Sequence, residues 1–277
     1  MMVEIKIITY NIKRLFVSND KYFLPHELSN YDIILLQECW NHNRKETILE
    51  EFSRLHKYNI SYNVKKPFYQ LLDNGLVILS KFKILENEFI SFKLGFFECI
   101  KNFTPLEVLG NKGILYVKLE IENQDYHIFN THLIANYTET QQNKISSLEE
   151  KLFTEIFDVI KDKTFSHNNS QDQKIILGGD FNNLPFFVNN YCKDDFNIYE
   201  PTEPTIFTNW ILPMIYEKSY SCIPEEENST KYKGYVLDYF ITKNVKMTNI
   251  KAIELIPEYS DHKAVSASFN IEINDKN

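Results

Sequence analysis

The chain has 277 residues, a hydrophobic fraction of 43% and a formal net charge of −8 at pH 7. This composition is ordinary for a globular protein with a sizeable core, and the acidic balance argues against broad electrostatic binding to nucleic acid or anionic lipid. It leaves room for a small basic or metal-filled cleft.

No linker rich in Pro, Gly or Ser and no internal repeat divides the sequence, so we expect one domain over residues 1–277. The scattered Cys39, Cys99, Cys192 and Cys222 indicate neither a zinc site nor a disulfide framework. The N-terminus reads as a strand without a cleaved signal peptide, and the longest apolar run is too short for a transmembrane segment. We expect a protein of the cytoplasm or peripheral to a membrane, with export without a signal left open.

Apolar runs predict strands at Val3–Tyr10, Tyr31–Leu36, Leu76–Leu79, Ile84–Phe92, Leu115–Ile121, Tyr126–Asn130, Ile175–Leu177, Tyr235–Thr242 and His262–Ile273. Two helices are predicted, at Arg44–Tyr58 and Glu139–Lys163. The first carries Ile48, Phe52 and Leu55 at helical spacing. Many strands with few helices favour two packed sheets with helices outside, rather than a doubly wound parallel sheet.

The most informative segment is Lys174–Pro185, in which a buried strand ends in glycines and then in polar residues. Gly178 and Gly179 allow close backbone approach. Asp180 and Asn182 follow, and a carboxylate and a carboxamide at the end of a buried strand are costly unless they meet a polar or cationic partner. Taken alone, the segment is explained equally well by a strand ending in an Asx turn.

Other predicted strands also carry polar residues at or near their ends: Asn11, Glu38, His132, Asp261 and His262, with Asp238 inside an apolar strand. Each residue alone has an ordinary structural explanation, such as a solvated strand end or a core histidine. Together, carboxylates, carboxamides and histidines at equivalent positions indicate a site for a hard cation and a phosphate. Mg²⁺ prefers such oxygen ligands and is usually completed by substrate phosphate.

The motifs are, in order, Tyr-Asn11, Leu-Gln-Glu38, Asn-Thr-His132, Gly-Asp-Phe-Asn182, Leu-Asp238-Tyr and Ser-Asp261-His262. This series resembles the endonuclease/exonuclease/phosphatase superfamily, which includes DNase I, over nearly the whole chain. The resemblance implies an α+β fold, a four-layer α/β/β/α sandwich of two packed mixed sheets flanked by helices. It also implies hydrolysis of a phosphoester by in-line attack of water.

The resemblance further implies which residues bind a metal and which position the water. Glu38 and Asn11 are expected to hold Mg²⁺, with Mn²⁺ as a substitute, and Asp261 is expected to be a further metal or outer ligand. Asp180 is expected to orient or deprotonate the attacking water, and Asn182 to hold that water and the phosphate.

The remaining roles implied by the resemblance concern the phosphate. His262 is expected to face it, with Asp238 fixing the imidazole tautomer. His132 is expected to stabilise charge that develops on the phosphoryl oxygens. The residues expected to contact substrate are Asn74, Lys112, His132 and Asn182.

Three further segments, Asn74–Lys81, Asn111–Gly113 and Thr131–Tyr137, resemble the neutral sphingomyelinase branch. This resemblance implies phospholipase C-type cleavage of sphingomyelin to ceramide and phosphocholine by a peripheral monomer at a membrane surface. The candidates for lipid contact are Phe92–Leu109, and Phe186-Phe187 together with Trp210–Tyr216. Packing of these side chains under long loops explains them about as well.

Three alternatives stay open. A phosphoinositide or inositol phosphate phosphatase would use lysines, and Lys65, Lys66, Lys81, Lys83 and Lys112 are available. Phosphatases of this kind often carry a basic residue shortly before this aspartate, but two positions before Asp238 this chain has Val236. A DNase I-like or abasic-site nuclease is less favoured because no basic groove is indicated. An inactive binding module would be favoured by loss of a motif residue, and none is lost.

Overall fold

The structure, a computed structural model, describes residues 2–12, 24–40, 45–63, 73–93, 110–134, 142–165, 172–182, 196–203, 205, 236–255, 260 and 262–272. Its elements are β1 (Met2–Asn11), η1 (His26–Asn30), β2 (Ile33–Gln37), α1 (Lys45–His56), β3 (Asn59–Tyr62), β4 (Val77–Ser80), β5 (Lys83–Ser91), β6 (Gly113–Ile121), β7 (Gln124–His132), α4 (Gln142–Phe165), β8 (Lys174–Asp180), β9 (Asn197–Tyr199), β10 (Asp238–Lys243), β11 (Met247–Ile253) and β12 (Ala264–Glu272).

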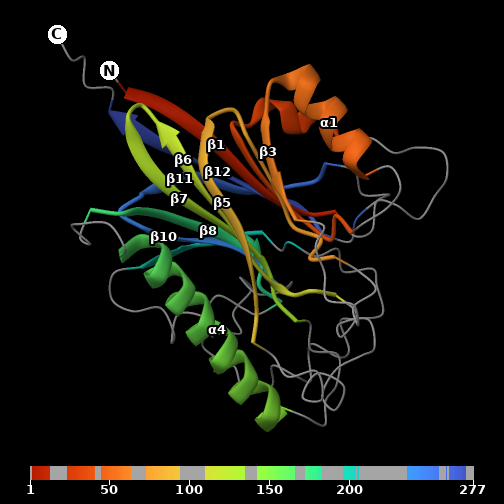
Figure 1. Ribbon diagram of the computed structural model, residues 1–277, viewed down its shortest axis with the longest axis vertical. Helices are drawn as coiled ribbons and strands as arrows, with labels where there is room; N and C mark the ends of the chain where they lie inside the picture. Colours follow the sequence, from red (N-terminus) through yellow and green to blue (C-terminus); the bar gives the residue numbers. More distant parts are fainter. Residues whose placement is uncertain are drawn as a thin grey trace.

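Within these residues the strands form two six-stranded sheets, with α1 outside one sheet and α4 outside the other (Figure 1). The first sheet has the order β11-β12-β1-β2-β4-β3, and the second has the order β5-β6-β7-β8-β10-β9. Each sheet is mixed, because β1 runs parallel to β2 and β7 runs parallel to β8 while their other neighbours run antiparallel. The predicted four-layer α+β sandwich is confirmed.

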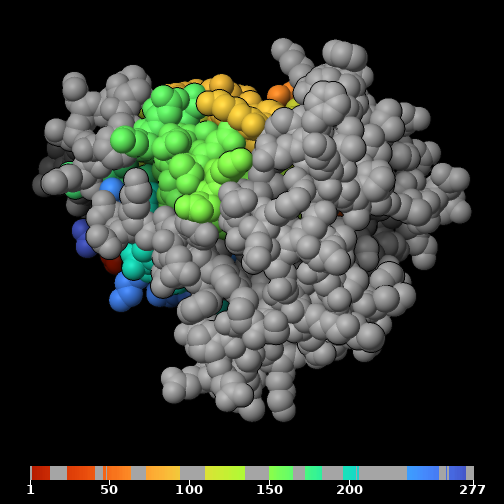
Figure 2. Space-filling model, turned by 90° about the horizontal axis from the view of Figure 1, so that it is seen from below, coloured from red at the N-terminus to blue at the C-terminus, as the bar shows by residue number. Residues whose placement is uncertain are grey.

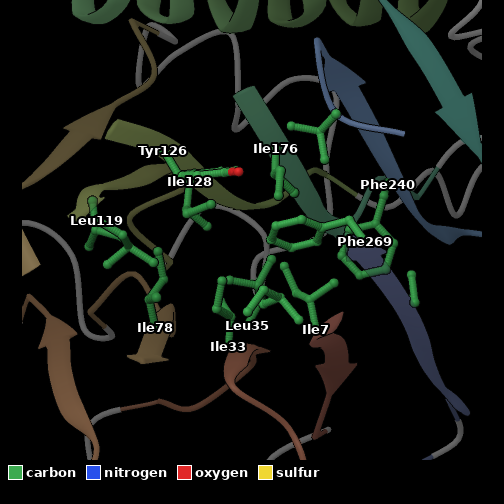
Figure 3. Close-up of a cluster of buried hydrophobic side chains, with 14 of the residues drawn as sticks. Ile7, Ile33, Leu35, Ile78, Leu119, Tyr126, Ile128, Ile176, Phe240 and Phe269 are labelled. Carbon is green, nitrogen blue, oxygen red and sulfur yellow. The ribbon is translucent and has the colours of Figure 1, made fainter. Parts of the chain in front are cut away.

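The apolar core between the two sheets holds the sandwich together. Ile7, Ile33 and Leu35 of the first sheet face Ile176 and Phe240 of the second (Figure 3). All five side chains are buried completely. Complete burial of such a side chain contributes about 1.5–3 kcal/mol relative to exposure. The alternating apolar residues of the predicted strands therefore point into this layer, as the sequence pattern requires.

Helix α4 covers the second sheet with one apolar stripe. Leu152, Ile156 and Ile160 are buried against that sheet, while Glu150 and Asp158 are exposed. Figure 2 shows the green atoms of α4 beside the gold atoms of the edge strand β5. No helix in the described parts of the chain is both long and apolar enough to cross a membrane.

Of the apolar residues noted at helical spacing in α1, Phe52 is buried and Leu55 is exposed. Leu49 and Phe52 are buried against the first sheet, but Leu55 is 61% exposed. Leu49 and Phe52 are three residues apart and lie on one face of the helix. Leu55 is rotated past the edge of that face and does not pack into the core.

The sequence patterns missed three strands, β3, β9 and β11. All three are edge strands, at the ends of the two sheets. Most of their residues are exposed or half-buried, so their apolar alternation is weak. A strand with one open edge depends on its single neighbour for pairing, and its own sequence carries little of that information.

Candidate active site

The polar residues predicted from the strand ends meet at one edge of the sandwich. In the parallel pair of β7 and β8, His132 lies opposite Asp180. In the antiparallel pair of β10 and β8, Asp238 lies opposite the same residue. Asn11 ends β1 beside Gln37, the last residue of β2. Strand register thus brings His132, Asp180 and Asp238 together in the second sheet, and packing of the two sheets adds Asn11 of the first.

Asp238 was expected inside a strand but lies at the start of one. It is the first residue of β10, and the preceding Val236 and Leu237 lie outside the ladder. Because β10 runs antiparallel to β8, its first residue lies at the same edge as the last residue of β8. Asp238 is therefore a strand-end residue like the others.

Asp180 lies at the centre of the site. Its Oδ2 atom accepts a hydrogen bond from Nδ2 of Asn11 at 2.8 Å. The Nε2 atoms of His132 and His262 each lie 3.6 Å from the same oxygen. This separation is longer than a hydrogen bond, so both imidazoles face the carboxylate without bonding to it. The Oδ1 atom accepts a hydrogen bond from the backbone N–H of Asn182 at 2.9 Å.

Burial raises the pKa of Asp180 above its ordinary value of 3.8, and the neighbouring Asp238 carboxylate raises the pKa further. The His262 imidazole and the hydrogen bonds from Asn11 and Asn182 oppose this rise by stabilising the charged form. Asp180 thus has the features of a carboxylate that can take up a proton near neutral pH.

Asp238 and His262 form a hydrogen-bonded pair. Nδ1 of His262 lies 2.8 Å from Oδ2 of Asp238, and both side chains are buried. A carboxylate accepts only, so Nδ1 carries the donated proton and Nε2 is directed toward Asp180. Ser260 adds a second restraint, since its hydroxyl accepts from the backbone N–H of His262 at 3.0 Å and donates to the backbone oxygen of Asn11 at 2.6 Å.

His132 is a neutral imidazole in this site. Burial lowers its pKa well below 6.5, and the positive charges of Lys112 and His262 lower it further. Lys112 is itself buried and donates from Nζ to the backbone oxygen of Leu133 at 3.2 Å. The Nδ1 atom of His132 has no hydrogen-bond partner among the described residues.

Glu38 and Asn182 both have positive backbone φ angles, 56° and 48°. Asparagine adopts this conformation readily, but a glutamate there is uncommon, and such residues concentrate at functional sites. Asn182 also donates from Nδ2 to the backbone oxygen of Leu133 at 2.9 Å. Glu38 Oε1 lies 3.4 Å from Nδ2 of Asn11, so the carboxylate borders the central cluster.

A divalent cation fits this donor set. Glu38, Asp180 and Asp238 bring three carboxylates into a largely buried space, in which burial and then the Asp238 carboxylate raise the pKa of Asp180. The ligand atoms of Asp180, Asp238 and His262 lie within 4.8 Å of one another. The Asp238–His262 hydrogen bond occupies one atom of each partner. The oxygen donors of Glu38 and Asn11 are therefore better suited to hold a hard cation.

The side chain of Asn74 is occupied within its own loop. Its Nδ2 donates to the backbone oxygen of Asn63 at 3.0 Å, and its Oδ1 accepts from the backbone N–H of Leu76 at 2.8 Å. These bonds fix the turn that contains Gly75, which has a φ of 64°. Contact of Asn74 with substrate stays a prediction.

Trp40 borders the site and was not predicted from the sequence. Its ring centre lies 6.4 Å from that of His132, and Nζ of Lys112 lies 5.9 Å from the ring centre. A Cβ atom at Gly75 would lie only 2.8 Å from the indole, and one at Gly110 would lie 3.1 Å away. The sequence did contain a signal for this contact. Trp40 is an aromatic residue two positions after a predicted metal ligand, and two loops of the chain carry glycines.

Several predicted residues lie outside the described parts of the chain. They are Asp261, Phe186-Phe187, Trp210–Tyr216 and residues 94–109. Phe92, at the start of one predicted lipid-contact segment, is described and is buried against the layer of α4. For that residue the alternative, packing in the core, is correct. Cys39 is buried, and the other three cysteines are not among the described residues.

A four-layer sandwich that gathers acidic, amide and imidazole groups from both sheets at one edge has the form of a hydrolase. The chain belongs to the endonuclease/exonuclease/phosphatase family, whose model matches residues 8–262. The predicted resemblance to this family, and to its sphingomyelinase branch, is confirmed.

Two relatives and one solved structure illustrate the likeness. The chain is 25% identical to sphingomyelinase C 2 of Leptospira interrogans, over 65% of this chain and 31% of that protein. It is 24% identical to a sphingomyelinase C of Bacillus cereus, over 56% of this chain and 46% of that protein. It therefore aligns with less than half the length of either relative. A Staphylococcus aureus beta toxin variant with bound magnesium ions has the same fold, with a TM-score of 0.64, 17% identity and coverage of 96% and 99% of the two chains.

Proposed function

We propose that this chain is a Mg²⁺-dependent phosphodiesterase that hydrolyses a phospholipid head group, with sphingomyelin cleaved to ceramide and phosphocholine. The single observation that carries the proposal is the arrangement around Asp180, where one buried carboxylate is faced by two imidazoles at 3.6 Å. The sphingomyelinase names of the relatives support the choice of substrate.

Glu38 and Asn11 would hold the Mg²⁺ ion, which supplies positive charge for the phosphoryl oxygens in the transition state. Side chains of the protein carry out the other steps. Asp180 accepts a proton from the attacking water, and its raised pKa makes it a stronger base than an ordinary aspartate. Asn182, whose backbone N–H holds Asp180 at 2.9 Å, keeps that carboxylate in place.

The Asp238–His262 pair serves the leaving group. The Asp238 carboxylate stabilises the imidazolium form of His262, which donates Nε2–H toward the phosphate. The water oxygen bonds to phosphorus as the bond from phosphorus to the ceramide oxygen breaks, and that oxygen takes the His262 proton. His132, held neutral by its surroundings, donates a hydrogen bond to a phosphoryl oxygen without adding a charge.

The proposal is tested by incubating purified protein with sphingomyelin micelles and Mg²⁺ and measuring released phosphocholine. The controls are EDTA and the variant His262→Ala, which is expected to keep the fold and lose turnover. Release that both controls abolish would support the proposal. If folded protein released no phosphocholine, it would be overturned for sphingomyelin, and phosphoinositides and then abasic or intact DNA would be the next substrates to assay.

A further inference from the structure

Directly behind the site, three buried polar side chains connect the two sheets. Thr9 lies on β1, Gln37 on β2 and Asn130 on β7, and each has 0% exposure. Nε2 of Gln37 donates to Oγ1 of Thr9 at 2.9 Å and to Oδ1 of Asn130 at 2.7 Å. The Gln37 amide thereby joins a residue of its own sheet to a residue of the opposite sheet.

Asn130 extends the connection to a third strand of the first sheet. Its Nδ2 donates to the backbone oxygens of Leu36 at 2.9 Å and Val77 at 3.0 Å. These two residues form a facing pair between β2 and β4. One side chain of the second sheet is therefore bonded to the first sheet at three points, all within the buried layer.

These three polar side chains are unfavourable for stability if their only role is to pack between the sheets. The surrounding layer between the sheets is apolar, and Gln37 Oε1 is buried with no hydrogen-bond partner among the described residues. An unpaired buried acceptor lowers stability, whereas apolar side chains of similar shape would avoid that loss. Stability by itself therefore does not explain why these three residues are polar.

Their positions in the sequence suggest the explanation. Thr9 precedes Asn11 by two residues, Gln37 directly precedes Glu38, and Asn130 precedes His132 by two. Apolar packing is non-directional and tolerates sliding of one sheet over the other. Hydrogen bonds between the sheets select one relative position.

We propose that Thr9, Gln37 and Asn130 form a positioning cluster, which sets the metal ligands of the first sheet relative to the catalytic groups of the second. This inference rests on the proposed function, because it assumes that Asn11 and Glu38 hold a metal while His132 and Asp180 act on the substrate. Displacement of reacting groups by about 1 Å can lower turnover by about 100-fold.

The test compares Thr9→Val, which removes one of the two side-chain acceptors of Gln37 Nε2, with Thr9→Ser, which keeps it. Asn130→Leu removes the bonds to Leu36 and Val77 and the bond that Gln37 Nε2 donates to Asn130 Oδ1. Thr242→Val is the matched stability control, because Thr242 is also completely buried and donates to the backbone oxygen of Val245 at 2.6 Å, at the other end of β10. Each variant is assayed below its unfolding transition, as established by circular dichroism.

Two readouts are taken, kcat and KM for phosphocholine release, and Mn²⁺ affinity by electron paramagnetic resonance without substrate. We expect Thr9→Val and Asn130→Leu to lower kcat by about 10- to 100-fold with KM nearly unchanged, and to weaken Mn²⁺ binding. Thr9→Ser should restore kcat. Thr242→Val should keep the wild-type kcat and Mn²⁺ affinity even if its melting temperature falls as much as that of Thr9→Val or Asn130→Leu.

Wild-type kcat and Mn²⁺ affinity in folded Thr9→Val would overturn the inference, as would an equal loss of kcat in Thr242→Val. If Asn130→Leu does not fold, the Thr9 pair still decides the outcome. If the wild type binds Mn²⁺ but hydrolyses no sphingomyelin, the proposed function fails. The positioning inference is then judged by Mn²⁺ affinity alone, and unchanged affinity in Thr9→Val overturns it.

Discussion

Nδ1 of His262 and Oδ2 of Asp238 are 2.8 Å apart, in a pair that is buried and directed at Asp180. The two residues lie on neither the same strand nor the same sheet, since Asp238 begins β10 and His262 precedes β12. The hydrogen bond therefore depends on correct packing of one sheet on the other.

For Asp238→Asn we expect turnover to fall by roughly 10³- to 10⁴-fold with little change in fold. Asparagine keeps the shape of the side chain but removes the charge that stabilises the His262 imidazolium. Phosphocholine release and thermal unfolding by circular dichroism check both parts. Asp125→Asn, at an exposed carboxylate paired with the half-buried Lys118, is the matched control, and an equal loss of turnover there would contradict the assignment.

For Glu38→Gln we expect the Mg²⁺ concentration for half-maximal activity to rise about tenfold or more, because a neutral amide is a weaker ligand for a hard cation than a carboxylate. A titration of activity against Mg²⁺ measures this change. Glu50→Gln, at an exposed position on α1, should leave the titration as in the wild type. An unchanged titration for Glu38→Gln would remove Glu38 from the metal site.

His127 should make the fold sensitive to acid. Its Nδ1 lies 3.1 Å from the hydroxyl of Tyr116 and its Nε2 lies 2.8 Å from Oε1 of Gln173, an arrangement that suits the neutral ring. Burial lowers the pKa of His127 in the folded state below 6.5. Below that pH the unfolded chain binds a proton that the folded chain does not, so stability falls as pH falls.

For His127→Gln we therefore expect a smaller loss of stability than in the wild type between about pH 7 and about pH 5, by at most about 1.4 kcal/mol per pH unit. Urea unfolding at both pH values gives the difference, in which the contributions of other groups cancel. The exposed His26→Gln is the control. If the free energy of unfolding depended on pH equally in the wild type and in His127→Gln, the fold would tolerate protonation of this ring.

Gly75 and Trp40 should be energetically coupled. An alanine at position 75 would keep an unfavourable φ of 64° and would place its Cβ 2.8 Å from the indole, so we expect a loss of about 1–3 kcal/mol. With Trp40→Leu also present, the steric part of this loss should disappear, and the penalty should shrink by about 0.5 kcal/mol or more. Urea unfolding of the four proteins of the cycle measures the coupling. Strict additivity would mean that the indole does not restrict this turn.

The layers of the sandwich were predictable because residues in the middle of a sheet are buried on both faces. Ile33–Leu36 and Ile175–Leu177 are continuous apolar runs, and both became central strands in the structure. The edge strands β3, β9 and β11 were not predictable in the same way, because one open edge leaves them half-exposed. The exposure of Leu55 shows that spacing alone does not fix the buried face of a helix, because the sheet on which the helix packs selects that face.

The polar residues at strand ends, Asn11, His132 and Asp180, could be recognised from the sequence by themselves, because a charged or amide group that closes an apolar run is costly without a partner. Tertiary structure alone decided which partners they meet. The register of β7, β8 and β10 places His132 and Asp238 opposite Asp180. Sheet packing places His262 against Asp180 and Asn130 against Gln37, and the pairing of β2 with β4 brings Trp40 against Gly75. Local sequence determines burial and turn preferences. Distances between residues of different sheets are set only when the two sheets pack in one relative position.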